Sequence, residues 1–162
     1  VAAAPLSLIS GAVSLVHLRA IADMTQSSSR VFGYMAKLTF FLSMFAGIPG
    51  VFLFITGPDL FALIFGETWR PAGEILRIII PAIVVQFVVS TLSPVFSSTG
   101  NSHLAAGWRV LGFIVVMSVF LYFSGNVDVL DLFYVIAVTD IALYSLYFFL
   151  ICYAVSRPKE FV

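Results

Sequence analysis

Long apolar stretches limit most strongly what this chain can fold into. Four of them, at about 38–57, 75–96, 104–124 and 132–153, each run for about twenty residues with few or no charged side chains. An α-helix rises about 1.5 Å per residue, so about twenty residues cross a hydrocarbon core of about 30 Å. A further block, residues 2–18, is just long enough to span. We therefore expect an all-α, polytopic membrane helix bundle with about five transmembrane helices.

The composition agrees with this interpretation and excludes several classes of function. Of the 162 residues, 61% are hydrophobic, well above the roughly 45–50% of soluble domains, and the mean hydropathy is +1.11. The formal net charge is zero, so no basic surface indicates a nucleic-acid partner. The lone Cys152 has no partner for an internal disulfide, and His17 and His103 stand apart from any metal-binding cluster. We expect no catalytic residues, metal or cofactor, and therefore no enzyme.

The basic residues predict how the spans are oriented. The first residue is Val and the apolar sequence starts at once, so we expect 1–162 to be a single membrane domain from a longer chain. Basic residues prefer the cytoplasmic side. With five spans, one side receives Arg70 and Arg77, each close to a glutamate, and the other receives Arg19, Arg30, Lys37, Arg109, Arg157 and Lys159. The C-terminus is thus predicted to be cytoplasmic.

A short charged segment lies between the second and third blocks. Residues 58–66 are predicted to form a short interfacial helix capped by Asp59 and stopped by Gly66, and Pro71 suits the first turn of the next helix. Four charged side chains then recur at helical spacing, namely Glu67, Arg70, Glu74 and Arg77. Pairing with one another is the favoured interpretation. Recognition of an anionic head group by Arg70 or Arg77 is the alternative.

Asp140 is the most informative polar residue because it lies well inside the last block. A carboxylate there costs about 2.5–3.5 kcal/mol on insertion scales, so it should face a cavity or a partner, or be protonated. A proton or cation site in a transport pathway and a hydrogen bond to a neighbouring helix both remain open. Tyr144 and Tyr147 share its face, and packing explains them better than stacking on a sugar.

A polar stripe runs along the third block. Gln86, Ser90, Ser93 and Ser97 recur at helical spacing and could line an aqueous path or let two helices approach closely. The larger Gln86 favours the path. A similar line in the second block consists of Thr39, Ser43, Gly47 and Gly50, and its glycines favour close packing. Six residues are thus candidates for a substrate or ion pathway: Asp140, Gln86, Ser90, Arg77, Arg70 and Tyr144.

Three segments together resemble a known family. These are "PLSLISGAVSLVHLRAIAD", "GIPGVFLFITGPDLFALIFGETWRPAGEILRIIIP" and "LSPVFSSTGNSHLAAGW". In this order they are similar to the C-terminal half of bacterial polysaccharide biosynthesis transporters, the O-antigen and exopolysaccharide flippases of the multidrug/oligosaccharidyl-lipid/polysaccharide superfamily. The most specific shared positions are Pro58, Gly66, Trp69, Ala72, Leu76, Pro81, Gly100 and Asn101.

The resemblance implies a two-lobed transporter in the bacterial inner membrane, of which this chain supplies the C-terminal lobe. Its cargo would be a polyprenyl-diphosphate-linked oligosaccharide for cell-surface polysaccharide, moved between leaflets by alternating access. Its partners would be that cargo, membrane lipid and the missing N-terminal lobe of the same chain. A multidrug exporter or peptidoglycan-precursor flippase of the same superfamily is one alternative. A non-transporting scaffold of a polysaccharide assembly complex is another.

Overall fold

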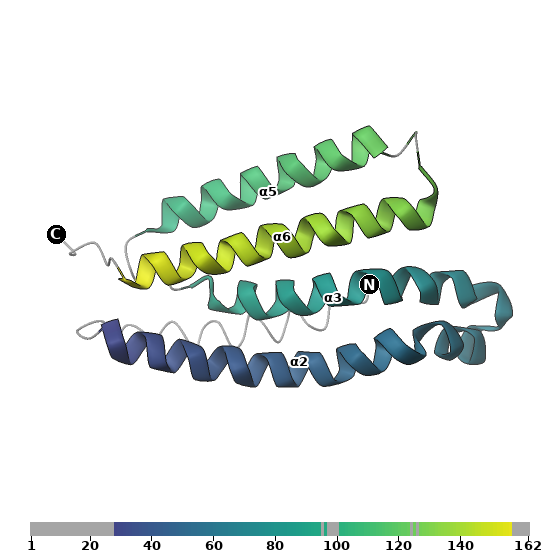
Figure 1. Ribbon diagram of the computed structural model, residues 1–162, viewed down its shortest axis with the longest axis horizontal. Helices are drawn as coiled ribbons and strands as arrows, with labels where there is room; N and C mark the ends of the chain where they lie inside the picture. The colour runs from purple at the N-terminus through teal and green to yellow at the C-terminus, as the bar shows by residue number, and fades with distance from the viewer. Residues whose placement is uncertain (1–27, 95, 97–100, 124, 126, 157–162) are drawn as a thin grey trace.

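The computed structural model describes residues 28–94, 96, 101–123, 125 and 127–156. The chain there forms a bundle of long helices (Figure 1). In chain order its elements are α2 (Ser28–Phe65), the 3-10 turn η1 (Glu67–Trp69), α3 (Arg70–Leu92), α5 (Ser102–Phe123) and α6 (Val129–Ser156). Its four α-helices are each long and apolar enough to cross a membrane, and the described residues contain no strand. The prediction of an all-α membrane helix bundle is confirmed.

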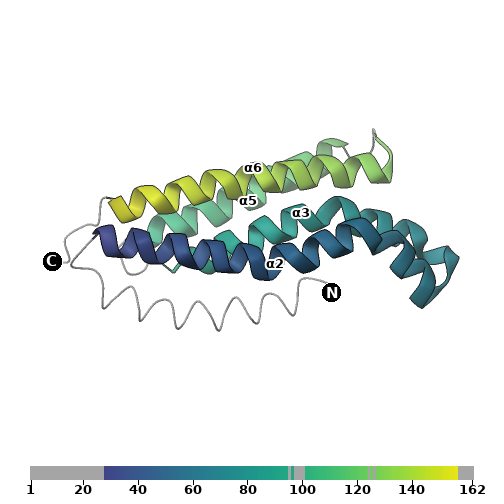
Figure 2. The same ribbon diagram turned by 60° about the horizontal axis from the view of Figure 1, so that its bottom comes forward.

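Successive helices run in opposite directions. The starts of α2 and α5 lie at the same end of the bundle as the ends of α3 and α6, as both views show (Figures 1 and 2). The predicted spans at 38–57, 75–96, 104–124 and 132–153 correspond to these four helices, with boundaries shifted by a few residues. The predicted span at 2–18 lies outside the described residues.

The second helix is longer than predicted. A separate interfacial helix at 58–66 is wrong, because α2 continues through Pro49 and Pro58 to Phe65 and bends toward its C-terminal end (Figure 2). A proline inside a membrane helix is tolerated where neighbouring structure compensates for its missing N–H. Here α3 packs against the backbone of Gly57 and Pro58. With 38 residues α2 is about 57 Å long, so it extends beyond the hydrocarbon core.

The turn between α2 and α3 follows the sequence signals. Gly66 has φ 94° and ψ 162°, a backbone conformation that residues with a Cβ rarely adopt, and its N–H donates to the carbonyl of Ala62 at 2.9 Å. Helix α3 then begins at Arg70 with Pro71 in its first turn. The predictions that Gly66 stops one helix and that Pro71 starts the next are both confirmed.

Two glycines allow α2 and α3 to pack at backbone distance. A Cβ added to Gly73 would lie 2.6 Å from the Pro58 Cα and 2.7 Å from the Gly57 carbonyl oxygen, and one added to Gly50 would lie 2.7 Å from a Val84 methyl. Gly47, by contrast, has nothing within 4 Å of that position. Close packing along the predicted line of small residues in α2 therefore occurs at Gly50 and not at Gly47.

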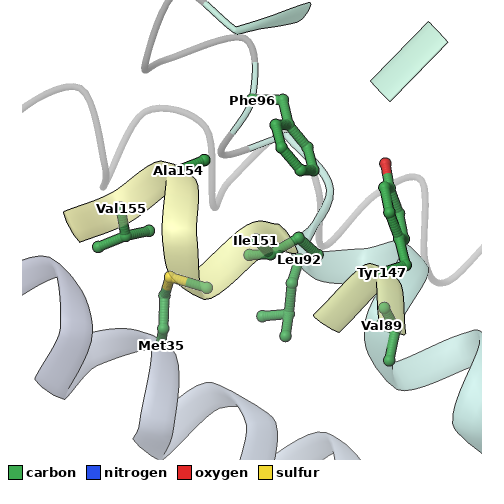
Figure 3. Packing of buried hydrophobic residues seen from close by; sticks show 8 residues of the cluster. All are labelled: Met35, Val89, Leu92, Phe96, Tyr147, Ile151, Ala154 and Val155. Carbon is green, nitrogen blue, oxygen red and sulfur yellow. The ribbon is translucent and has the colours of Figure 1, made fainter. Parts of the chain in front are cut away.

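The best-packed region joins α2, α3 and α6 near the end of the bundle where α3 and α6 finish. Its buried residues are Met35, Val89, Leu92, Phe96, Tyr147, Ile151, Ala154 and Val155 (Figure 3). A smaller cluster, Leu42, Ala46, Phe87 and Val88, fills the contact between α2 and α3. Helix α5 packs mainly on α6 and has no buried residue. It is the most loosely held helix of the four.

Much of the outer surface is apolar. On α5 the exposed side chains include Phe113 (66% exposed) and Leu121 (68%), and on α2 they include Phe40 (68%) and Phe41 (64%). Exposed apolar area of this extent is abnormal in a water-soluble monomer but ordinary for a surface that contacts lipid. The exposed apolar residues therefore agree with a bundle whose surroundings are hydrocarbon.

Candidate functional site

One pocket brings together Asp140, Arg109 and several hydroxyl groups from inside the spans. It lies between α3, α5 and α6 and has a volume of about 290 Å³. Its wall consists of Ser90, Ser93, Trp108, Arg109, Gly112, Phe113, Val116, Asp140, Leu143, Tyr144 and Tyr147. Two other hollows both include Thr39 and Ser43, one between α2, α3 and α6 and the other between α2 and α6, and their described walls contain no charged residue. The pocket beside α5 is therefore the candidate site.

Helical spacing positions each wall of this pocket. Asp140, Tyr144 and Tyr147 are four and three residues apart on α6, so they point to the same side. Ser90 and Ser93 provide the same relationship on α3. The α5 wall contains Gly112, where an added Cβ would meet nothing within 4 Å, so this helix leaves open space opposite the polar residues of α6.

Two unpaired charges of opposite sign line this pocket. Asp140 is partly buried, Arg109 is exposed, and within the described part of the chain neither makes an ion pair or a side-chain hydrogen bond. Ionisable residues inside membrane spans are rare and usually pair with one another or face an aqueous pathway. Asp140 and Arg109 line the same pocket without contacting each other. The pocket therefore offers a negative and a positive group with which a polar or charged solute can interact.

A stack of three aromatic rings closes one end of the site. The Tyr147 ring lies between Phe96, with centroids 5.5 Å apart, and Trp108, with centroids 5.7 Å apart. This geometry favours the packing interpretation of Tyr147, because neighbours already cover its ring on both sides. Its hydroxyl is buried, and the Ser93 hydroxyl and the Arg109 guanidinium lie close enough to act on it. Figure 3 shows this hydroxyl pointing away from Leu92 and Ile151.

The structure brings three of the six predicted pathway residues together. Asp140, Ser90 and Tyr144 line the pocket, and Ser93 from the predicted polar stripe joins them. Gln86 is exposed and does not line it. Ser97, the last member of that stripe, lies outside the described residues. The polar stripe therefore splits, with its two central serines facing the pocket and Gln86 directed elsewhere.

Arg70 and Arg77 lie at the opposite end of the bundle, near the turn between α2 and α3. The Arg70 guanidinium contacts Asp59 at 2.8 Å and Glu67 at 2.9 Å. Two carboxylates thus hold Arg70, which favours pairing over binding of a head group for this residue. Of the predicted pairs in the stripe, the described part of the chain shows only Glu67 with Arg70, since Glu74 and Arg77 form no ion pair there. Arg77 is exposed and stands 5.1 Å above the Phe54 ring, a cation–π contact. Asp59, predicted as a helix cap, instead ties α2 to the start of α3.

Sequence reasoning missed Arg109 as a site residue. It counted this residue only among the charges at the cytoplasmic boundary. Arg109 nevertheless lies five residues inside the predicted 104–124 span, and depth inside an apolar block was the signal that singled out Asp140. The signal is weaker for Arg109 than for Asp140, which lies eight residues inside its own predicted span.

The described residues contain no group of His, Cys, Asp and Glu side chains that could hold a metal ion. Comparison with known families, characterised proteins and solved structures gives no match: no family model, no curated protein and no solved structure is similar to this chain at a significant level. The pocket geometry, the charges and the sequence pattern therefore carry the functional argument.

Proposed function

We propose that this chain is part of a membrane transporter that moves lipid-linked oligosaccharide across the bacterial inner membrane by alternating access. The observation that carries the proposal is the polar pocket in the membrane bundle. Asp140, Ser90 and Tyr144 face a common space of about 290 Å³ from two helices, and Arg109 adds a cationic group from a third. Polar groups that converge inside a bundle of spanning helices mark substrate and ion pathways.

The sequence resemblance supplies the class of cargo. Repeat units linked to polyprenyl diphosphate carry hydroxyls and anionic phosphates, and the pocket offers hydrogen-bonding side chains and a guanidinium for such groups. The volume suits one sugar-sized group better than a whole repeat unit, since ligand pockets typically measure about 300–1,000 Å³. The remaining cargo would extend toward the other lobe that the resemblance implies.

The distribution of basic residues supports an orientation. Lys37 and Arg109 lie toward the end of the bundle that holds the starts of α2 and α5, whereas Arg70 and Arg77 lie toward the other end. In the described part of the chain carboxylates pair with Arg70, whereas Lys37, Arg109 and Arg77 form no ion pair, so the first end has more unpaired basic charge than the other end. By the positive-inside preference, we place the first end and the C-terminus in the cytoplasm.

Flipping of a labelled cargo in proteoliposomes tests the proposal. The full-length protein is reconstituted with a fluorescent polyprenyl-diphosphate-linked oligosaccharide, and a membrane-impermeant quencher reports its transfer between leaflets under an imposed cation or proton gradient. If Asp140 couples transport to the gradient, Asp140→Asn should reduce gradient-dependent flipping by at least about tenfold, because the amide cannot carry the charge.

Asp131→Asn is the matched control. It makes the same change on the same helix, but Asp131 is exposed in the first turn of α6 and does not line the pocket. Flipping by this variant should equal that of the unmodified protein. Absence of flipping by the unmodified protein, with correct reconstitution, would count against transport and favour a scaffold role. If Asp140→Asn and Asp131→Asn both flip the cargo as fast as the unmodified protein, Asp140 has only a packing role.

A further inference from the structure

We propose that the pocket between α3, α5 and α6 binds a dipolar group, with a cationic amine at Asp140 and an anionic substituent at Arg109. This inference rests on the proposed function in one respect, because the group with both charges would belong to the transported cargo. A transporter selective for it would carry repeat units that contain a free amine and an acidic or phosphorylated substituent.

The first observation is the distance between the two charges. Asp140 precedes Tyr147 by seven residues, which corresponds to about 10 Å along α6. Trp108 stacks on Tyr147, so its neighbour Arg109 lies at the Tyr147 end of the pocket. Asp140 and Arg109 therefore lie on different walls of one pocket, Asp140 on α6 and Arg109 on α5, with Arg109 nearer to Tyr147.

The second observation is that Asp140 is partly buried without an ion pair in the part of the chain that the structure describes, whereas Arg109 is exposed and available to a ligand. A structural ion pair in a membrane bundle places its partners in contact, because an unpaired charge in low dielectric is costly. Within the described residues neither Asp140 nor Arg109 makes such a contact. A ligand with matching charges of opposite sign would satisfy both groups at once.

The third observation is the buried hydroxyl of Tyr147. The residue is only 4% exposed, and the Ser93 hydroxyl and the Arg109 guanidinium both act on its hydroxyl. The Tyr147 end of the pocket therefore already gathers hydrogen-bonding groups around Arg109, as an anionic substituent requires. Ser90 and Ser93 add two further hydroxyls on the α3 wall, and Gly112 keeps the α5 wall open.

Other classes of ligand match the charges and hydroxyls of the pocket wall less well. A neutral sugar would use the hydroxyls but leave both charges without a counter-charge. A lone metal or alkali cation would neutralise Asp140 and gain nothing from Arg109. An anion alone would suit Arg109 and be repelled by Asp140. Only a ligand that carries both signs uses every polar group in the wall.

The fluorescence of Trp108 provides a direct test. The chain contains two tryptophans, so Trp69→Phe leaves Trp108, which lines the pocket, as its sole indole reporter. The full chain in lipid nanodiscs is titrated with four probes that form a matched set: glucosamine 6-phosphate carries both charges, N-acetylglucosamine 6-phosphate only the anion, glucosamine only the amine, and glucose neither.

We expect glucosamine 6-phosphate to bind at least about tenfold more tightly than each singly charged probe, because each end adds a charge-assisted hydrogen bond. Asp140→Asn should abolish the preference for the free amine and keep the preference for phosphate. Arg109→Gln should abolish the preference for phosphate and keep the preference for the free amine. Asp131→Asn should change neither preference.

Charge-conserving variants keep the test decisive if an amide variant misfolds. Asp140→Glu and Arg109→Lys should retain the preference for the doubly charged probe. Equal affinity for all four probes, no response of Trp108 to any of them, or a preference unchanged in both amide variants would each overturn the inference. Charge-selective binding without flipping would overturn only the transport proposal, and flipping without charge-selective binding would overturn only this inference.

Discussion

The Trp108 indole lies parallel to the Tyr147 phenol ring, with centroids 5.7 Å apart and an angle of 8° between the planes. This stack helps to hold α5, which has no buried residue and packs mainly on α6. Phe96 extends the stack to the chain that follows α3. Two ring contacts thus link α5, α6 and the chain that follows α3 beside the candidate site.

Removing the stacked indole should loosen α5. Trp108→Ala should lower the free energy of unfolding by about 2 kcal/mol, through lost burial and lost ring stacking, with some discount because Trp108 is only partly buried. Unfolding by sodium dodecyl sulfate in mixed micelles measures the change. Phe120→Ala, at an exposed position on the same helix, should cost much less. Similar losses for the two variants would contradict the role of the stack.

Gly73 is predicted to be intolerant of any side chain. Gly73→Ala should destabilise the protein by about 1–3 kcal/mol, because its Cβ would collide with backbone atoms of Gly57 and Pro58 that cannot move without shifting α2. Gly47→Ala introduces the same methyl into open space and should be neutral or stabilising by up to about 1 kcal/mol. Equal stability of the two variants in the same unfolding assay would show that α2 and α3 are not packed this closely.

The turn at Gly66 is predicted to depend on glycine for its backbone conformation. Gly66→Ala should cost about 1–3 kcal/mol, because φ 94° with ψ 162° lies in a region that is essentially restricted to glycine. Gly107→Ala, in the open surface of α5, serves as the control and should not destabilise. The midpoint temperature of thermal unfolding in detergent is measured for Gly66→Ala and Gly107→Ala. A neutral Gly66→Ala would rule out the strained turn.

The two ends of α6 should lie on opposite sides of the membrane. Its 28 residues extend for about 42 Å, enough to cross the bilayer. Cys152 is the only cysteine of the chain, so Cys152→Ala gives a background for Ser156→Cys and Asp128→Cys. A membrane-impermeant thiol reagent applied to intact cells should label position 128 and not position 156. Labelling of both positions from the same side would refute the orientation.

The sequence predicted the spans well because apolar length is a local property. Gly66 and Pro71 were also interpreted correctly, since backbone preferences act within one turn. The interpretation of Pro58 and Asp59 as a helix start failed for a tertiary reason: the contact with Gly73 holds Pro58 inside α2, and Arg70 draws the Asp59 carboxylate toward α3.

The candidate site was predictable only in part. Spacing placed Asp140 and Tyr144 on one face, and Ser90 and Ser93 on another, but spacing within a helix does not reveal which helices meet. The contact of α5 with α6 decides that Arg109 shares the pocket with Asp140. Likewise, the direction in which Gln86 points depends on the rotation of α3 within the bundle.

The central claim is that the pocket beside Asp140 is a water-accessible part of a cargo pathway, and thiol accessibility tests it most directly. In the Cys152→Ala background, Ser90→Cys places a thiol in the pocket, and Ser118→Cys places one on the exposed surface of α5. With the full-length protein in membranes, we predict that a hydrophilic reagent labels position 90 much faster than position 118, and that added polyprenyl-diphosphate-linked oligosaccharide slows labelling at position 90 alone. Equal labelling rates, or a rate at position 90 that the cargo leaves unchanged, would contradict the claim.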